Sequence, residues 1–456
     1  MTSVAPRISL PPPRPAPDEP SAPRPAPPLR RLWAAIVRRP SWLVAATVVS
    51  VAVPAGRPGG GISVTAADVA SAVMVLFVTF VAVSRRRALP ARALPAFAPL
   101  VVALGVTTLA SQDVEASLPG FVRTAQIFVL VPLAVVLAVQ DRRDVGIIGG
   151  AVLATALGEG VFGLWQALTL NGASYGGRDV RAVGTFGSLD IMALATLSSF
   201  GIVLAVAFTT VVRGRFRLVL LLAVVVQLAA LGAALSRGSF LALVIAVTVM
   251  LALYDRLVLL RVAVCVAALA IIVMGGFGLG SETVGARLTS IADSVGTPDQ
   301  SVSDRYSLWG TATAIWREHP VTGVGVKNFS QYRDTYAPLQ LSSGSETADA
   351  RNGYVRQPLL SPHNQYLLIL SEQGLLGLAA FVTLLLALVR GLWRHRSRDD
   401  AAWPLAVGFL CWLLVNFLYA DMGGPTSVLT SILLGLAATR ALSPPGRGPT
   451  APGAPR

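Results

Sequence analysis

Charged residues are scarce in this sequence. Only 13% of the 456 residues are Asp, Glu, Lys or Arg, whereas 54% are apolar. Soluble domains contain about 25% charged and about 45–50% apolar residues. A soluble enzyme of this length would need far more charge to cover its surface. The composition therefore excludes an ordinary soluble protein and a disordered one, and it predicts a polytopic membrane protein.

Cysteine and histidine are also rare, with two and three copies respectively. Cys265 and Cys411 both lie inside apolar runs, which argues against a disulfide framework. No cysteine pair has the spacing of a zinc site, and His319, His363 and His395 are too few for a multi-histidine metal centre. We therefore expect neither a metal nor a cofactor.

Several catalytic signatures are absent from the sequence. It has no phosphate-binding glycine loop, no GxSxG or HExxH motif, and no dinucleotide fingerprint. No DxD-type acidic pair occurs on a predicted outer loop, so nothing indicates a metal-bound sugar nucleotide as donor.

The positive charge is distributed as in a membrane protein. The net charge is +14, but the basic residues form short clusters between apolar runs rather than a basic domain, so we expect no nucleic-acid partner. With the N-terminus placed in the cytoplasm, about two-thirds of the 37 Lys and Arg residues fall on the cytoplasmic side. This alternation predicts an even number of spans in the cell membrane, with both termini cytoplasmic.

Apolar runs predict an all-α protein with twelve transmembrane helices of roughly 20 residues each. A Pro/Arg-rich tail at 1–40 and a short tail at 442–456 are predicted to be disordered and cytoplasmic. Nine spans occupy 41–279, a large extracytoplasmic loop occupies 280–362, and three spans occupy 363–441. The predicted spans are about 41–56, 64–83, 94–110, 121–139, 145–168, 189–212, 217–235, 239–254, 258–279, 363–389, 402–420 and 425–441.

The long loop contains one amphipathic segment. Over residues 303–319, apolar residues recur at the spacing of a helix, with Ser303 as a possible cap and Pro320 as a stop. We expect this helix to lie on the membrane surface or to pack over the bundle. Residues 338–358 are polar and are expected to be mobile or to act as a lid.

Three basic residues are candidates for binding an anion at the outer surface. Arg237 lies in a short outer turn, where Arg is less expected, and its planar fork suits phosphate oxygens. The alternative is an arginine that merely ends a span. Arg305 opens the amphipathic helix, and taken alone it is better explained as a solvent-exposed charge. Lys327 is a weaker candidate for the same pocket.

His363 is the strongest catalytic candidate from the residues alone. It lies where the long loop returns to the membrane, and Pro362 fits the first position of a helix, so His363 is expected in its first turn. A lone histidine more often serves a structural role, but imidazole suits proton transfer near neutral pH. Tyr366 would share its helical face.

Acidic residues in or beside the spans are further candidates. Glu372 lies nine residues after His363, which puts it on the opposite face of a regular helix and excludes a His–Glu pair there. Structural and functional roles for Glu372 remain equally open. Asp190 and Asp421 lie at the outer ends of spans and have no clear role from the sequence.

Three motifs together resemble the O-antigen ligase / Wzy polymerase family. They are LSRGSFLAL at 235–243, DRYSLWGTATAIWREHPVTGVGVKNF at 304–329, and SPHNQYLLILSEQGLLGL at 361–378, and the likeness covers mainly 225–390. The resemblance implies a GT-C-like membrane glycosyltransferase that works without a metal. The implied donor is a glycan on undecaprenyl diphosphate at the outer face of the membrane, and the implied acceptor is a hydroxyl of a glycan, lipid or protein.

The resemblance also implies roles for individual residues. Arg237 and Arg305 would bind the diphosphate and His363 would be the catalytic base, with Lys327, Tyr366 and Glu372 as secondary candidates. Direct attack of the acceptor hydroxyl on the anomeric carbon would invert that centre. The leading hypothesis is therefore a ligase in cell-surface polysaccharide biosynthesis. A polymerase using the same donor, and a transporter or flippase, are the alternatives.

Overall fold

The computed structural model describes residues 35–54, 64–175, 178–276, 300–342, 344–397 and 400–442. Most of the predicted N-terminal tail, residues 443–456 of the predicted C-terminal tail and residues 280–299 of the long loop lie outside these ranges. Residues 35–38 form a helical turn by themselves. The description below concerns the described residues from Arg39 onward, which belong to one compact unit.

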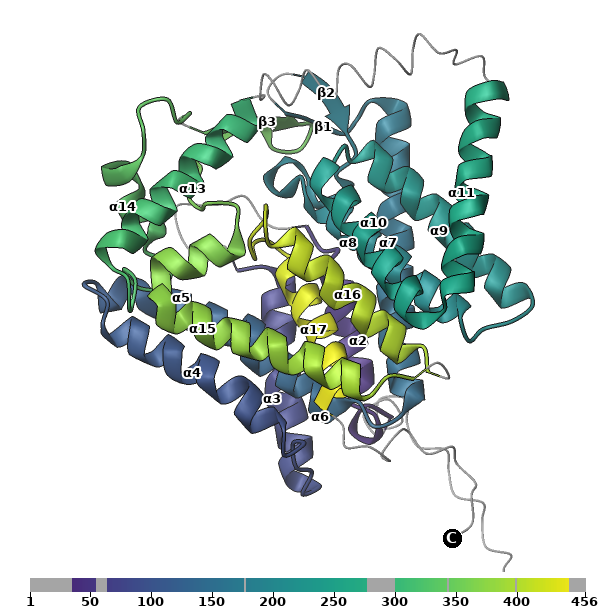
Figure 1. The fold of residues 1–456 in the computed structure, drawn as a ribbon, viewed down its shortest axis with the longest axis horizontal. Coiled ribbons are helices and arrows are strands. Elements are labelled where there is room, and N and C mark those ends of the chain that lie inside the picture. Colours follow the sequence, from purple (N-terminus) through teal and green to yellow (C-terminus); the bar gives the residue numbers. More distant parts are fainter. Residues whose placement is uncertain are drawn as a thin grey trace, which may run out of the picture. The chain divides into compact units, whose positions relative to one another are not determined.

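Apolar helices occupy all the segments that the sequence predicts as spans (Figure 1). Within the described residues, six are long and apolar enough to cross a membrane, namely Ala66–Ser84, Val114–Ala138, Arg142–Thr169, Arg215–Ala233, Arg237–Tyr254 and Gln365–Arg394. A mostly helical, multi-pass membrane protein is thereby confirmed, while twelve crossings and the GT-C-like arrangement stay predictions. The apolar helices are α2 (Ser41–Ser50), α3 (Ala66–Ser84), α4 (Ala93–Leu109), α5 (Val114–Ala125), α6 (Val131–Ala138), α7 (Arg142–Thr169), α8 (Ala193–Thr209), α9 (Arg215–Ala233), α10 (Arg237–Tyr254), α11 (Arg256–Gly276), α15 (Gln365–Arg394), α16 (Ala402–Asn416) and α17 (Thr426–Leu442).

The outer surfaces of several helices are apolar. On α3, for example, the side chains of Leu76, Phe80 and Val83 are 72%, 66% and 73% exposed. Exposing so much apolar area to water would be costly, whereas lipid tails accept it. The apolar side chains that the helices leave exposed therefore suit contact with a lipid bilayer.

A small β-sheet distinguishes the structure from the all-α prediction. The strands β1 (Ala173–Tyr175), β2 (Arg178–Arg181), β3 (Ser345–Asp349) and β4 (Gly353–Gln357) are antiparallel in the order β2-β1-β3-β4. The segment predicted to be mobile or lid-like thus contains a hairpin, and β3 pairs with a strand more than 160 residues earlier. That pairing joins two connections that are far apart in the sequence, so a local pattern does not reveal it.

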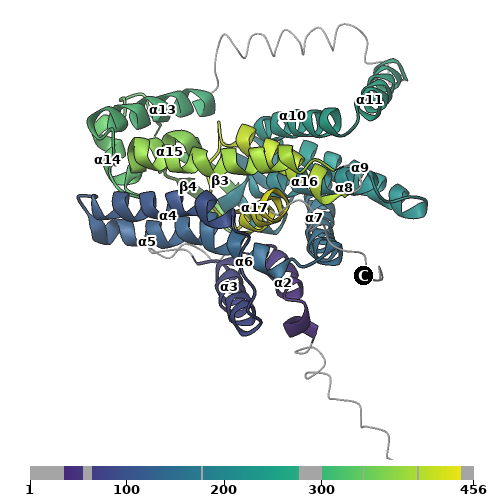
Figure 2. The same ribbon diagram turned by 60° about the horizontal axis from the view of Figure 1, so that its bottom comes forward.

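The amphipathic segment forms helix α13 (Gln300–Glu318). Ser303 lies inside this helix, so its predicted capping role is wrong, whereas the stop before Pro320 is correct. Leu308, Ala312 and Ile315 are buried, as the periodicity predicts. The helix packs against α15 and against α14 (Phe329–Tyr336), as both views show (Figures 1 and 2).

Candidate functional site

His363 lies in a bend just before α15 rather than in the first turn of a helix. Its φ is +48°, a left-handed conformation that is uncommon for residues other than glycine, although Asn, Asp and His adopt it more often than the rest. The N-cap of α15 is Asn364, whose side chain accepts hydrogen bonds from the backbone N–H groups of Tyr366 and Leu367. The sequence-based placement from Pro362 is therefore wrong, because an asparagine two residues later is the stronger cap.

The bend around His363 is held from two sides. The indole Nε1 of Trp309 on α13 donates a hydrogen bond to the carbonyl oxygen of Pro362 at 2.9 Å. On the other side, the Asn364 amide donates to the carbonyl oxygen of Leu418, in the segment between α16 and α17. Strain in the backbone at His363 persists because these contacts fix both neighbours, a pattern that is concentrated at functional sites.

Arg305 lies on the same face of α13 as Trp309, one turn earlier. Burial is the main cause that lowers the pKa of His363 below its usual value of 6.5. The carboxylate of Asp421 opposes this shift, and the positive charge of Arg305 adds to it. The structure thus groups Arg305, His363 and Asp421, and the balance of causes favours a neutral imidazole that can accept a proton.

Arg237 is the first residue of α10, after the N-cap Ser236. Its neighbour Gly238 lies beneath the ring of Tyr419, and the Tyr419 hydroxyl donates a hydrogen bond to the Gly238 carbonyl oxygen. Burial raises the pKa of Tyr419 to about 12, and the charge of Arg305 opposes this shift. Tyr419 therefore holds the start of α10, the helix that Arg237 begins.

The three secondary candidates make mainly structural contacts. The Tyr366 hydroxyl donates to the Leu414 carbonyl oxygen at 3.0 Å, which ties α15 to α16. Glu372 is buried and accepts a hydrogen bond from the Phe329 backbone N–H at 3.2 Å. Lys327 has an exposed side chain, a φ of +67°, and its Cβ lies over Gly120 of α5.

Helix α15 is broken at Gly374, where φ is +62° and ψ is −161°. The loop before α14 supplies the missing hydrogen bonds. Val324 and Gly325 donate to the carbonyl oxygens of residues 371 and 372, and residues 375 and 376 donate to those of Pro320 and Val321. In an apolar environment such freed backbone groups must find partners, so the loop and the helix form one structure.

Replacing Gly374 with alanine should lower the free energy of unfolding by about 1–3 kcal/mol, because the positive φ strains an L residue. A Cβ at this position would also collide with the backbone of Val321. Thermal unfolding in detergent measures the effect. The matched control is Gly105→Ala in α4, where a Cβ meets no atom within 4 Å. Equal stability of the two variants would contradict the argument.

Two carboxylates near the candidate site are distinguished by their burial, which the sequence does not reveal. The Oδ2 atoms of Asp190 and Asp421 are buried without a hydrogen-bond partner among the described residues. Asp190 rests against Gly424, three residues after Asp421, and burial raises its pKa to about 7. The sequence offered only one signal for them, namely an acid at the outer end of an apolar run.

No cluster of three or more His, Cys, Asp or Glu side chains occurs in the part of the chain that the structure describes. That part consequently offers no donor set for a protein-bound metal ion. Catalysis without a metal ion stays a prediction.

Comparison with known proteins supports the resemblance. Residues 222–382 match the family model described as O-antigen ligase. The matched range runs from α9 into α15 and contains Arg237, Arg305 and His363. The chain matches no curated protein. The family match indicates an O-antigen ligase-like or polymerase-like role in polysaccharide biosynthesis. The chain is thus a multi-pass membrane protein whose residues 222–382 carry the sequence pattern of the O-antigen ligase family.

Proposed function

We propose that the protein is a membrane glycosyltransferase of the O-antigen ligase type. It transfers a glycan from undecaprenyl diphosphate to an acceptor hydroxyl at the extracytoplasmic face of the cell membrane. The observation that carries the proposal is the hydrogen bond from Trp309, one turn after Arg305 on α13, to the carbonyl oxygen of Pro362 beside His363, within the range that matches the family.

The reaction forms one bond and breaks one bond. The acceptor oxygen attacks the anomeric carbon of the first sugar, and the bond from that carbon to the diphosphate oxygen breaks. His363 takes the proton of the attacking hydroxyl, which its lowered pKa permits at neutral pH. Arg305 and Arg237 neutralise the charge on the departing diphosphate. Attack from the side opposite the leaving group inverts the anomeric centre.

The membrane location follows from the donor. An isoprenoid chain is apolar, so it stays among the lipid-facing helices while its diphosphate reaches the polar rim where Arg305 and His363 lie. The same donor and the same residues would serve a polymerase whose acceptor is a second carrier-linked glycan. Ligase and polymerase therefore differ only in the acceptor that approaches His363.

The proposed function is tested with purified protein in nanodiscs. The assay supplies the undecaprenyl-diphosphate-linked glycan from cells that lack this protein, together with envelope extracts as acceptors, and it includes EDTA. We expect release of undecaprenyl diphosphate and a larger glycan product despite the chelator. Failure to consume the donor would contradict glycan transfer, and loss of activity in EDTA would contradict the metal-free mechanism.

Replacing Asp421 with asparagine should move the acid limb of the kcat/KM profile to lower pH. The Asp421 carboxylate raises the pKa of His363, so its removal lowers that pKa further and keeps the imidazole neutral in more acidic solution. At Oδ2 the substitution breaks no hydrogen bond, because that atom of Asp421 has no hydrogen-bond partner within the described ranges. The control is Asp334→Asn on α14, an exposed carboxylate paired with Arg333. An acid limb that stays in place or moves to higher pH would contradict the assignment.

A further inference from the structure

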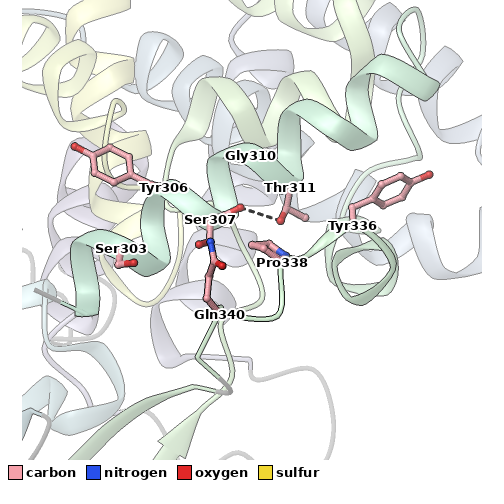
Figure 3. Close-up of a pocket in the computed structure, with 8 residues that line it drawn as sticks. All are labelled: Ser303, Tyr306, Ser307, Gly310, Thr311, Tyr336, Pro338 and Gln340. Carbon is pink, nitrogen blue, oxygen red and sulfur yellow. Dashed lines mark hydrogen bonds between the residues drawn. The ribbon is translucent and has the colours of Figure 1, made fainter. Parts of the chain in front are cut away.

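The outer side of α13 borders an open pocket with a volume of about 460 Å³ (Figure 3). This size falls within the range of about 300–1,000 Å³ that small-ligand sites occupy. One wall is a face of α13, and the other is formed by the end of α14 and the chain after it. The lining residues are Ser303, Tyr306, Ser307, Gly310, Thr311, Tyr336, Pro338 and Gln340.

The side chains that line the pocket indicate which class of ligand can bind there. None of the eight lining residues is charged, so the pocket is not suited to a diphosphate or to a cation. Hydroxyl and amide groups from Ser303, Ser307 and Gln340 make it too polar for an isoprenoid chain. Tyrosine rings at the edge add flat apolar surface with a polar end. A neutral ligand rich in hydroxyl groups, with apolar ring faces, fits this combination, and a sugar unit is such a ligand.

The pocket walls are fixed in place. Asp304 is buried and accepts hydrogen bonds from the Gln300 amide, the Ser342 backbone N–H and the Ser342 hydroxyl. These bonds anchor the chain after α14 to the first turns of α13. On the other wall, the Tyr336 hydroxyl donates to Glu318 at 2.5 Å. A site whose walls are already ordered loses less entropy when a ligand binds.

Aromatic contacts connect the pocket to the candidate site. The ring of Tyr306 meets the ring of Trp309 edge to face, with centroids 5.5 Å apart. Trp309 in turn donates to the Pro362 carbonyl oxygen, beside His363. Arg305 precedes Tyr306 in the chain and lies on the neighbouring face of the helix. Helix geometry puts Arg305 on roughly the opposite side of α13 from the lining residues Ser303 and Ser307. A glycan whose diphosphate lies at Arg305 would therefore reach the pocket by passing around the Tyr306 side of the helix.

We propose that the pocket of α13 binds a neutral sugar unit of the carrier-linked glycan, beyond the first sugar that reacts. The inference rests on the proposed function and deepens it, because it assigns a glycan subsite to the same enzyme. The subsite would let the enzyme distinguish a carrier with a full glycan from a carrier with a truncated one.

Binding measurements test the subsite with two probes. One is the undecaprenyl-diphosphate-linked glycan extracted from cells that lack this protein, and the other is the same lipid trimmed to its first sugar. The variant is Gly310→Trp, which fills the pocket from a helix position where a Cβ meets no atom within 4 Å. The matched control is Gly150→Trp in α7, an exposed helical glycine with equally open surroundings.

We expect the wild type and Gly150→Trp to bind the full glycan roughly tenfold more tightly than the trimmed lipid, an effect the size of one or two hydrogen bonds. Gly310→Trp should lose this preference and bind the trimmed lipid as the wild type does. A Gly310→Trp variant that keeps the preference, or that loses the trimmed lipid as well, would overturn the subsite. If the wild type binds both lipids equally, the subsite fails while the proposed function stands. If it binds neither, both fail.

Discussion

Replacing His363 with asparagine should lower kcat for glycan transfer by about 10²–10⁴-fold, the usual contribution of a positioned general base. Asparagine is the suitable replacement because the backbone at this position has a φ of +48°, and asparagine tolerates that conformation better than alanine does. The amide cannot take a proton at neutral pH. The variant should therefore fold and bind the donor, and it should fail only in the chemical step.

The matched control for this variant is His319→Asn. His319 follows α13, and its ring contacts Tyr332 rather than the grouping of His363 and Arg305. Its replacement should leave transfer unchanged. Donor binding to both variants, measured with the carrier-linked glycan, separates a lost base from a lost fold. Full transfer by His363→Asn would remove His363 from the mechanism.

Exchanging Arg305 for lysine should lower kcat by about 10²–10³-fold, because electrostatic donors aimed at developing charge contribute that much. Lysine keeps the charge but replaces the planar two-pronged donor with a single ammonium group, which cannot hold two phosphate oxygens in the same geometry. Single-turnover measurements with the carrier-linked glycan would report the loss directly.

Arg317→Lys is the control for this second variant. Arg317 lies on the same helix, near its end, and its side chain is exposed. We expect normal transfer from the Arg317 variant. Normal transfer from Arg305→Lys would mean that Arg305 does not contact the diphosphate, and it would favour the solvent-exposed charge that the residue suggests when taken alone.

The positions of the helices could be predicted because the signal is local. A run of about 20 apolar residues suits the bilayer wherever the rest of the chain lies. Capping is local too, as in α7, where Asp141 and Asp144 form a reciprocal cap at the predicted cytoplasmic start. The roles of residues that depend on partners far away in the chain are harder to predict from the sequence. The sequence predicts that α15 begins at Pro362, whereas the structure has Asn364 as its N-cap. The Asn364 side chain donates a hydrogen bond to the carbonyl oxygen of Leu418, 54 residues away.

The candidate site shows the same division. The chemistry and the position of His363 are enough to make it a candidate, whereas Arg305 is a candidate only because of the motif that contains it. Asp421 had no assigned role, because its effect on His363 arises from folding of the segment between α16 and α17 against residues 364 and 365. The sequence predicts Glu372 on the opposite face of a helix that contains His363, yet His363 lies before that helix, which is itself broken at Gly374. The sequence of residues 363–389 alone does not predict that a loop enters this break.

The backbone hydrogen bonds between α15 and the loop before α14, on both sides of Gly374, limit how the protein can be engineered. Residues 320–325 complete the hydrogen bonding of a membrane helix, so they are not a detachable connector between modules. A hybrid protein that took its outer loop from a relative would leave unmatched amide and carbonyl groups within α15. Such a transplant would have to carry residues 371–376 along with the loop.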